Sequence, residues 1–232
     1  MTVKLKPVVV EDAAAVAEAG AAWTAELING AVSERGACYL ALAGGETPRG
    51  CYQRLAAEPY QRSVRWGHVH VYWSDERQVP LDDLASNYGM AKTALLDRLA
   101  IPPGNVHPLV GDPIGALNQV PTGPGGCPRF DLIHLGLGED GHTASLFPGD
   151  AALGEQRAWI RAVRAVKPPP DRLTMTFPVL NAARAVLFLV QGDGKRRALA
   201  GVMAGDPSLP ASRVRPGEGE VRFIVDRAAW PV

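Results

Sequence analysis

The stretch FDLIHLGLGEDGHTASLFPG, residues 130–149, decides the fold of this chain. Its first part, residues 130–136, is a short and almost wholly apolar run that ends in a glycine-rich, polar turn. Residues 38–43 (CYLALA) and 185–190 (AVLFLV) follow the same plan, and each also ends at a turn containing glycine. Short apolar runs bounded by such turns are typical of strands that are buried on both faces of a parallel sheet.

Segments with a helical pattern separate these runs along the chain. We expect helices over residues 12–34, 48–57 and 195–204, and another that opens near Ser86, which is a suitable N-cap. Further strands are expected at 68–73, 158–163, 172–177 and 221–225, and residues 112–128, rich in Gly and Pro, are expected to form a loop. The alternation predicts an α/β fold with a mostly parallel sheet covered by helices on both faces, in one domain spanning residues 1–232.

Composition excludes several classes of function. The 24 basic and 24 acidic residues balance, so no net field attracts nucleic acid or an anionic membrane. Three cysteines without a C-x-x-C spacing indicate reduced thiols rather than a disulfide framework or a zinc site. The N-terminal apolar run is soon broken by Glu11 and Asp12, and no stretch approaches the roughly 20 apolar residues of a membrane span. We therefore expect a cytoplasmic protein with neither nucleic-acid nor membrane partners.

Parallel sheets bind ligands beyond the carboxyl ends of their strands. Four loops follow expected strands there, at residues 44–47, 74–77, 136–142 and 191–195, and we expect them to converge on one pocket. In the first loop, Gly44, Gly45 and the hydroxyl of Thr47 precede a helix, an arrangement that suits a phosphate as well as an ordinary turn. Glu46 fits a phosphate site only if its carboxylate points away.

The second and fourth loops carry charged side chains. Arg77 is suited to bind a phosphate or carboxylate, and Asp75 to orient a substrate hydroxyl or a catalytic histidine, although both also suit a solvated surface. Lys195 stands at the start of a helix, where a cation is unfavourable unless an anion is present. Arg172, just after a run of three prolines, is a weaker candidate of the same kind.

The third loop carries the strongest signal. Residues 136–141 match the dinucleotide pattern G-x-G-x-x-G, but Pro148 and Gly149 cut short the helix that this pattern needs, so we reject that interpretation. His142 follows at the mouth of an expected strand–loop–helix crossover, where an imidazole can take and return a proton near neutral pH. Ser145 lacks the G-x-S-x-G setting of a nucleophile, and we expect it to bond in the first turn of a helix.

Six collinear stretches closely resemble the 6-phosphogluconolactonase family, within the group that includes glucosamine-6-phosphate deaminases. They are LALAGGETPRGCY, VYWSDERQVPLDDLASNY, FDLIHLGLGEDGHTASLFPG, KPPPDRLTMTFPVLNAAR, LVQGDGKRRAL and LPASRV, and they lie in this order between about residues 38 and 230. The resemblance implies a Rossmann-like three-layer α/β/α sandwich that hydrolyses 6-phospho-D-glucono-1,5-lactone. Two departures are Glu46, where a small polar residue is common, and the short segment 112–128.

The resemblance also implies the roles of individual residues. His142 would be the catalytic base, and Arg77 would contact the substrate or its phosphate; from the residues of the second loop we also expect Asp75 and Arg77 to assist catalysis. The substrate and its phosphate would be held by residues of all four loops and by Arg172, namely Gly44, Gly45, Thr47, Gly138, Asp140, Gly141, Arg172 and Lys195. No metal or organic cofactor is implied, the partner is a sugar phosphate, and the chain would be a monomer or a weak homo-oligomer.

Two alternatives stay open at this stage. A deaminase would share the fold and the sugar-phosphate loops, but its histidine stretch resembles GHIAFNEP rather than GHTASLFP, and a tyrosine replaces the residue at Arg77. A non-catalytic sugar-phosphate sensor usually carries a DNA-binding module, and this chain has no basic helix-turn-helix segment.

Overall fold

A computed structural model describes residues 5–231. Its main sheet has six strands in the order β1-β9-β8-β5-β2-β3, and every neighbouring pair is parallel. The strands are β1 (Leu5–Val10), β2 (Cys38–Leu42), β3 (Val69–Trp73), β5 (Leu132–Leu135), β8 (Ala185–Val190) and β9 (Glu220–Asp226). The mostly parallel sheet predicted from the sequence is confirmed.

Strand β1, which contains Pro7, was not expected, because its apolar run is short and is soon broken by Glu11 and Asp12. It lies at the edge of the sheet and pairs only with β9, with Val8 opposite Ile224. An edge strand tolerates proline, since one row of its backbone groups needs no partner in the sheet. This pairing joins the two ends of the described chain.

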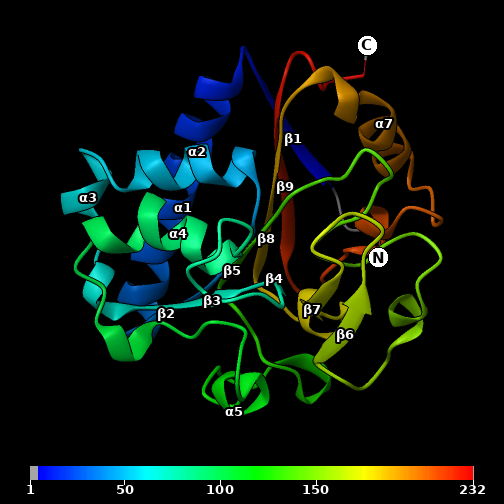
Figure 1. Cartoon of the computed structure of the whole chain (residues 1–232). Helices are drawn as coiled ribbons and strands as arrows, with labels where there is room; N and C mark the ends of the chain where they lie inside the picture. The colour runs from blue at the N-terminus through cyan, green and yellow to red at the C-terminus, as the bar shows by residue number, and fades with distance from the viewer. Residues whose placement is uncertain (1–4, 232) are drawn as a thin grey trace.

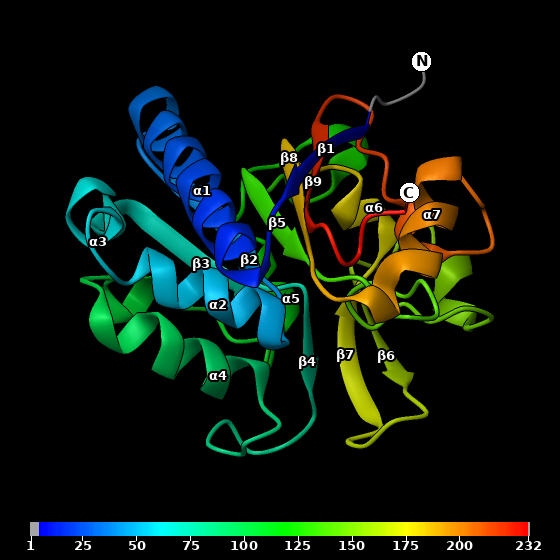
Figure 2. The same ribbon diagram turned by 90° about the horizontal axis from the view of Figure 1, so that it is seen from above.

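Helices cover both faces of the sheet, as Figures 1 and 2 show. On one face lie α1 (Ala13–Arg35), α2 (Glu46–Leu55), α3 (Tyr60–Ser63) and α4 (Asn87–Ala94). On the other lie α5 (Pro113–Leu117), α6 (Phe177–Leu180) and α7 (Arg196–Ala204). The result is the three-layer α/β/α sandwich. The expectation that residues 112–128 form a loop throughout is wrong, because they contain the short helix α5. This helix begins at Pro113 and is capped by the side chain of Asp112, which accepts from the N–H of Gly115.

The alternation of side chains in the central strands produces two cores. In β8, Leu187 and Leu189 pack in the core beneath α1 and α2, whereas Val186, Phe188 and Val190 pack in the core on the opposite face. All five are buried, and each contributes roughly 1.5–3 kcal/mol through the removal of apolar surface from water. Burial on both faces explains why the sequence of β8 has no polar alternation.

The predicted helix starts are close to those observed. Ser86 caps α4 by accepting a hydrogen bond from the backbone N–H of Gly89, as expected, and Asp12 caps α1 through Ala15. Helix α1 ends at Gly36, whose φ of 81° is a left-handed conformation that glycine adopts freely. Helix α2 begins at Glu46, two residues earlier than the proline that suggested its start.

A second, three-stranded antiparallel sheet projects from the main one. It comprises β4 (Asp75–Arg77), β7 (Asp171–Met175) and β6 (Ile160–Arg164), in the order β4-β7-β6. The expectation that Asp75–Arg77 is a loop is wrong, because these residues pair with β7, with Arg77 opposite Arg172. Three charged residues in succession show no alternation of apolar and polar side chains, so the sequence does not predict a strand. They form one because their backbone groups pair with those of β7.

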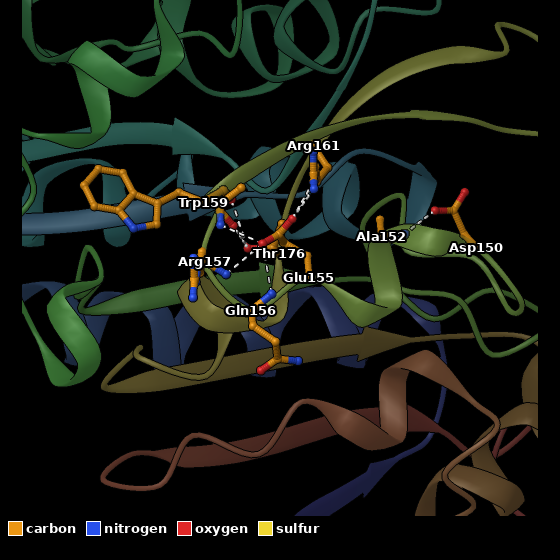
Figure 3. A network of polar contacts seen from close by, with 9 residues as sticks. Asp150, Ala152, Glu155, Gln156, Arg157, Trp159, Arg161 and Thr176 are labelled. Atoms are coloured by element: carbon orange, nitrogen blue, oxygen red, sulfur yellow. Dashed lines mark hydrogen bonds and ion pairs between the residues drawn. The ribbon is translucent and has the colours of Figure 1, made fainter.

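A network around Glu155 anchors the start of β6 (Figure 3). Its carboxylate accepts hydrogen bonds from the backbone N–H groups of Gln156, Arg157 and Ala158 and from the guanidinium of Arg161. The N–H groups of Ala158 and Arg157, followed by the guanidinium of Arg161, lower the pKa of Glu155 to about 2. Because β6 pairs with β7, the network fixes the strand that carries Arg172.

A buried histidine in β5 is expected to make stability depend on pH. His134 is fully buried, and its Nε2 lies 2.9 Å from the hydroxyl of Thr24. Burial lowers its pKa from 6.5 to about 3. Between these two pH values the unfolded chain binds a proton at His134 more readily than the folded protein does. The stability contributed by the neutral imidazole is therefore complete above pH 6.5 and is lost as pH falls toward 3.

We expect His134→Gln to remove this dependence. At about 1.4 kcal/mol per pH unit, the wild type should lose roughly 3 kcal/mol between pH 6.5 and 4 through His134 alone. Urea unfolding at several pH values measures the slope, and equal slopes for the two proteins would contradict the assignment. The exposed His68→Gln is the matched control.

Candidate active site

A cavity of about 370 Å³ lies at the carboxyl ends of the parallel strands. All four predicted loops contribute to its lining, together with β7. Nine of the residues singled out from the sequence line it: Gly44, Gly45, Thr47, Asp75, Arg77, Gly138, His142, Arg172 and Lys195. The lining also includes Asn87, Ala144 and Gln191, which the sequence analysis did not select. Asp140 and Gly141 lie outside this lining.

Asp140 instead orients the imidazole of His142. Its Oδ1 lies 2.5 Å from Nδ1 of His142 and also accepts from the backbone N–H of that residue. Burial tends to raise the pKa of Asp140, but these bonds from His142 outweigh it and hold the pKa below its ordinary value. A carboxylate at Nδ1 keeps the proton on that nitrogen, so Nε2 carries the lone pair.

Two glycines make this arrangement sterically possible. A Cβ on Gly138 would stand 2.1 Å from Nδ1 of His142, so only glycine permits the ring to lie against the loop. Gly141 has a φ of 81° and packs against Leu209, which fixes the turn just before the histidine. In this chain the glycines of the G-x-G-x-x-G pattern therefore position the imidazole of His142.

The segment after His142 differs from the expectation. Residues 142–149 form turns and a single β-bridge rather than the start of a helix. Ala144 has a φ of 49°, which is rare for a residue with a Cβ and interrupts helical geometry. Ser145 consequently makes no helix-start bond: its buried hydroxyl donates to Oδ2 of Asp75 at 2.6 Å. Asp75 thus ties the histidine loop to β4, and the partner of the imidazole is Asp140.

Arg77 and Arg172 place two cations side by side in the cavity wall. They are opposite each other in the β4–β7 pair, and Arg172 is only 7% exposed. Burial first, and then the charge of Arg77, lower the pKa of Arg172, while nearby Asp75 raises it. Arg77 also has a buried Nε without a hydrogen-bond partner among the described residues. Two adjacent cations in a cavity wall suit an anionic ligand.

The glycine loop presents the N-terminus of α2 to the same cavity. Gly45 has a φ of 102°, and α2, ten residues long, starts immediately after it. The carboxylate of Glu46 is 73% exposed and pairs with Arg49 at 2.9 Å, and Glu46 also contributes to the cavity lining. The charge of Arg49 offsets the repulsion that this carboxylate would exert on a phosphate at the loop.

The fourth loop is held by a residue that the sequence analysis missed. Both carboxylate oxygens of Asp226, the last residue of β9, accept from the backbone N–H of Gly192, at 3.1 and 3.0 Å. Lys195 follows one turn later, directly before α7. No local pattern marks Asp226, because its contact spans 34 residues of sequence.

Glu76 is 1% exposed and binds the N-terminus of α4, in addition to the N-cap Ser86. It lies in β4 between Asp75 and Arg77, which both line the cavity. Its carboxylate accepts from the N–H groups of Asn87 and Tyr88, both at 2.7 Å, and of Arg77 at 2.8 Å. The first two belong to the N-terminus of α4, so Glu76 positions Asn87 in the cavity. The sequence analysis missed Glu76 because it took residues 74–77 as a loop, in which a carboxylate is expected to face solvent.

Among residues 5–231, no group of three or more His, Cys, Asp or Glu side chains is arranged to hold a metal ion. None of the helices there combines the length and the apolar character needed to cross a membrane.

Fold and cavity together define a class: a three-layer α/β protein whose strand ends present an oriented histidine and several cations to one cavity. The chain belongs to the family described as glucosamine-6-phosphate isomerases/6-phosphogluconolactonase, whose model matches residues 11–223.

Individual relatives agree with this assignment. The chain is 40% identical to a 6-phosphogluconolactonase of Synechocystis, over 87% of each protein. It is 35% identical to a probable chloroplastic 6-phosphogluconolactonase 3 of rice, over 92% of this chain and 72% of the relative. Among solved structures, 6-phosphogluconolactonase from Trypanosoma cruzi superposes with a TM-score of 0.86 at 29% identity, covering 99% of this chain and 97% of the other.

Proposed function

We propose that this protein hydrolyses 6-phospho-D-glucono-1,5-lactone to 6-phosphogluconate, the second step of the oxidative pentose phosphate pathway. The observation that carries the proposal is the presence, in one cavity, of an imidazole oriented by Asp140 and a pair of arginines. The relatives named above supply the identity of the substrate, because the cavity alone indicates only an anionic compound that undergoes acid–base chemistry.

In the proposed mechanism, His142 activates a water molecule. Nε2 takes a proton as the water oxygen forms a bond to C1 of the lactone, and the carbonyl becomes a tetrahedral oxyanion. Arg77 and the N–H groups of the glycine-rich loop at residues 136–141 stabilise this charge. The C1–ring oxygen bond then breaks while the imidazolium returns its proton to the leaving oxygen. The carboxylic acid product finally loses its proton to solvent.

The phosphate binds in the same cavity through groups other than the imidazole. The candidates to bind it are the N-terminus of α2 with Gly45 and Thr47, together with Arg172 and Lys195. A helix N-terminus and cations combine unused N–H donors with positive charge, which favours a dianion. Because δ-lactones already open spontaneously in water, the mechanism needs no covalent nucleophile.

Acid release from freshly prepared phosphogluconolactone tests the function. A pH-stat should record release well above the spontaneous rate when the wild-type protein is added. Ammonia released from glucosamine 6-phosphate would instead identify a deaminase. Tight binding of 6-phosphogluconate without any turnover of the lactone would identify a sensor, and either result would overturn the proposal.

Replacing Arg172 with methionine is expected to raise KM for the phosphorylated lactone about tenfold to a hundredfold. A hydrogen bond to a charged group contributes about 1.5–3 kcal/mol, and methionine keeps much of the apolar stem. Turnover of unphosphorylated gluconolactone should change little. Equal losses for both lactones would show that Arg172 acts on the reacting carbonyl or on the fold instead. The exposed Arg62→Met is the control.

A further inference from the structure

The last residue before the glycine loop lies beyond the end of the sheet ladder. Strand β2 ends at Leu42, which pairs with Trp73 and accepts from the N–H of Ser74. Ala43 is the next residue, is 3% exposed and lines the cavity. A buried residue at the end of a ladder still has an N–H and a C=O that need hydrogen-bond partners.

One side chain satisfies both groups. The hydroxyl of Tyr52 accepts from the N–H of Ala43 at 2.8 Å and donates to its carbonyl at 3.0 Å. Tyr52 is fully buried in α2, the helix whose N-terminus faces the cavity. Burial raises the pKa of this phenol well above its ordinary value, so the hydroxyl keeps the proton that it donates.

The two hydrogen bonds fix the point at which the chain leaves the sheet. Gly44 follows at once, and a Cβ there would stand 1.9 Å from Oδ1 of Asn87, so only glycine lets the loop pack this closely against that side chain. Asn87 is itself fixed, because its Nδ2 donates to the carbonyl of Asp75 at 2.8 Å. The loop is therefore bonded through Ala43 to the hydroxyl of Tyr52 and packs at Gly44 against Asn87.

We infer that Tyr52 is a positioning residue for the anion-binding loop: its hydroxyl holds Ala43 so that Gly44 and Gly45 present their N–H groups to the phosphate of the substrate. Tyr52 does not line the cavity and acts only through the backbone. The inference rests on the proposed function for the identity of the substrate, but not for the presence of an anion site.

The decisive variant is Tyr52→Phe, which removes one oxygen atom and leaves the ring in place. We expect KM for the phosphorylated lactone to rise about tenfold and kcat to stay within about twofold, because the histidine loop is untouched. The inhibition constant of inorganic phosphate should rise by a similar factor, whereas kcat/KM for unphosphorylated gluconolactone should not change. The control is Tyr60→Phe, which removes a surface bond to Glu18.

Several outcomes would overturn the inference. If Tyr52→Phe lowers the melting temperature but leaves KM and phosphate inhibition unchanged, the hydroxyl serves stability alone. If the variant does not fold, Gly44→Ala displaces the same loop from the side of Asn87, and an unchanged KM in that variant rejects the positioning role.

Calorimetry with inorganic phosphate separates this test from the proposed function. If the wild type fails to hydrolyse the lactone, the function is wrong, but phosphate should still bind about tenfold more weakly to Tyr52→Phe than to the wild type. Equal phosphate affinities would reject the inference whatever the activity.

Discussion

His142→Ala is expected to lower kcat for the phosphorylated lactone by about 10²–10⁴-fold, while KM changes by less than about threefold. The size follows from the usual contribution of a positioned acid–base group. KM should be nearly unaffected because the arginines and the helix N-terminus, rather than the imidazole, hold the anion. Steady-state kinetics with correction for spontaneous opening measures both constants.

His68→Ala provides a matched control for this prediction, since His68 is exposed and lies in a short helical turn before β3. Its kcat and KM should equal those of the wild type. If His142→Ala retains more than about a tenth of the wild-type kcat, the imidazole does not activate the water, and the oxyanion donors would have to account for catalysis.

Glu76→Ala is expected to lower the free energy of unfolding by about 3–5 kcal/mol. The substitution leaves the N–H groups of Arg77, Asn87 and Tyr88 without their acceptor, and each unpaired buried group costs about 1–3 kcal/mol, less where water enters. Urea unfolding at pH 7 measures the loss. Glu26→Ala, an exposed carboxylate on α1, should change stability by less than about 0.5 kcal/mol.

Glu76→Gln separates the charge of this group from its geometry. Burial raises the pKa of Glu76, against the three backbone N–H groups that lower it. A carboxylate whose folded-state pKa is raised destabilises the fold as pH rises through that pKa. Glutamine carries no charge, so the cost of burying the ionised carboxylate should be absent from the Glu76→Gln variant. A loss in Glu76→Gln as large as that in Glu76→Ala would show that both oxygens must accept.

Much of the fold could be predicted from local patterns. The runs at 38–43 and 185–190 are apolar throughout because their strands are buried on both faces, and that burial is found only in covered parallel sheets. The glycine turns then located the carboxyl ends of the strands, and hence the edge where a ligand binds. This is why loops as far apart as Gly44 and Lys195 were expected together, and they line one cavity.

The elements that were missed lack a local signal. The charged stretch Asp75–Arg77 forms a strand only because β7 offers a partner, and the short apolar run of β1 forms one at the edge of the sheet by pairing with β9. The helix expected after His142 is replaced by turns, among which Ala144 has a positive φ that no sequence pattern announces. In each case the pairing or the close packing of distant segments determines the conformation.

Local sequence patterns predict the layers of this protein, the edge of its sheet that carries the cavity and the types of side chain found there. The partners of these side chains depend on tertiary packing: Asp140 rather than Asp75 orients the imidazole, Ser145 bonds Asp75, and Tyr52 holds Ala43. The difference lies in the range over which each interaction acts. Periodicity and turn preference act over a few residues, whereas a hydrogen bond between buried groups depends on where packing brings two distant segments within about 3 Å.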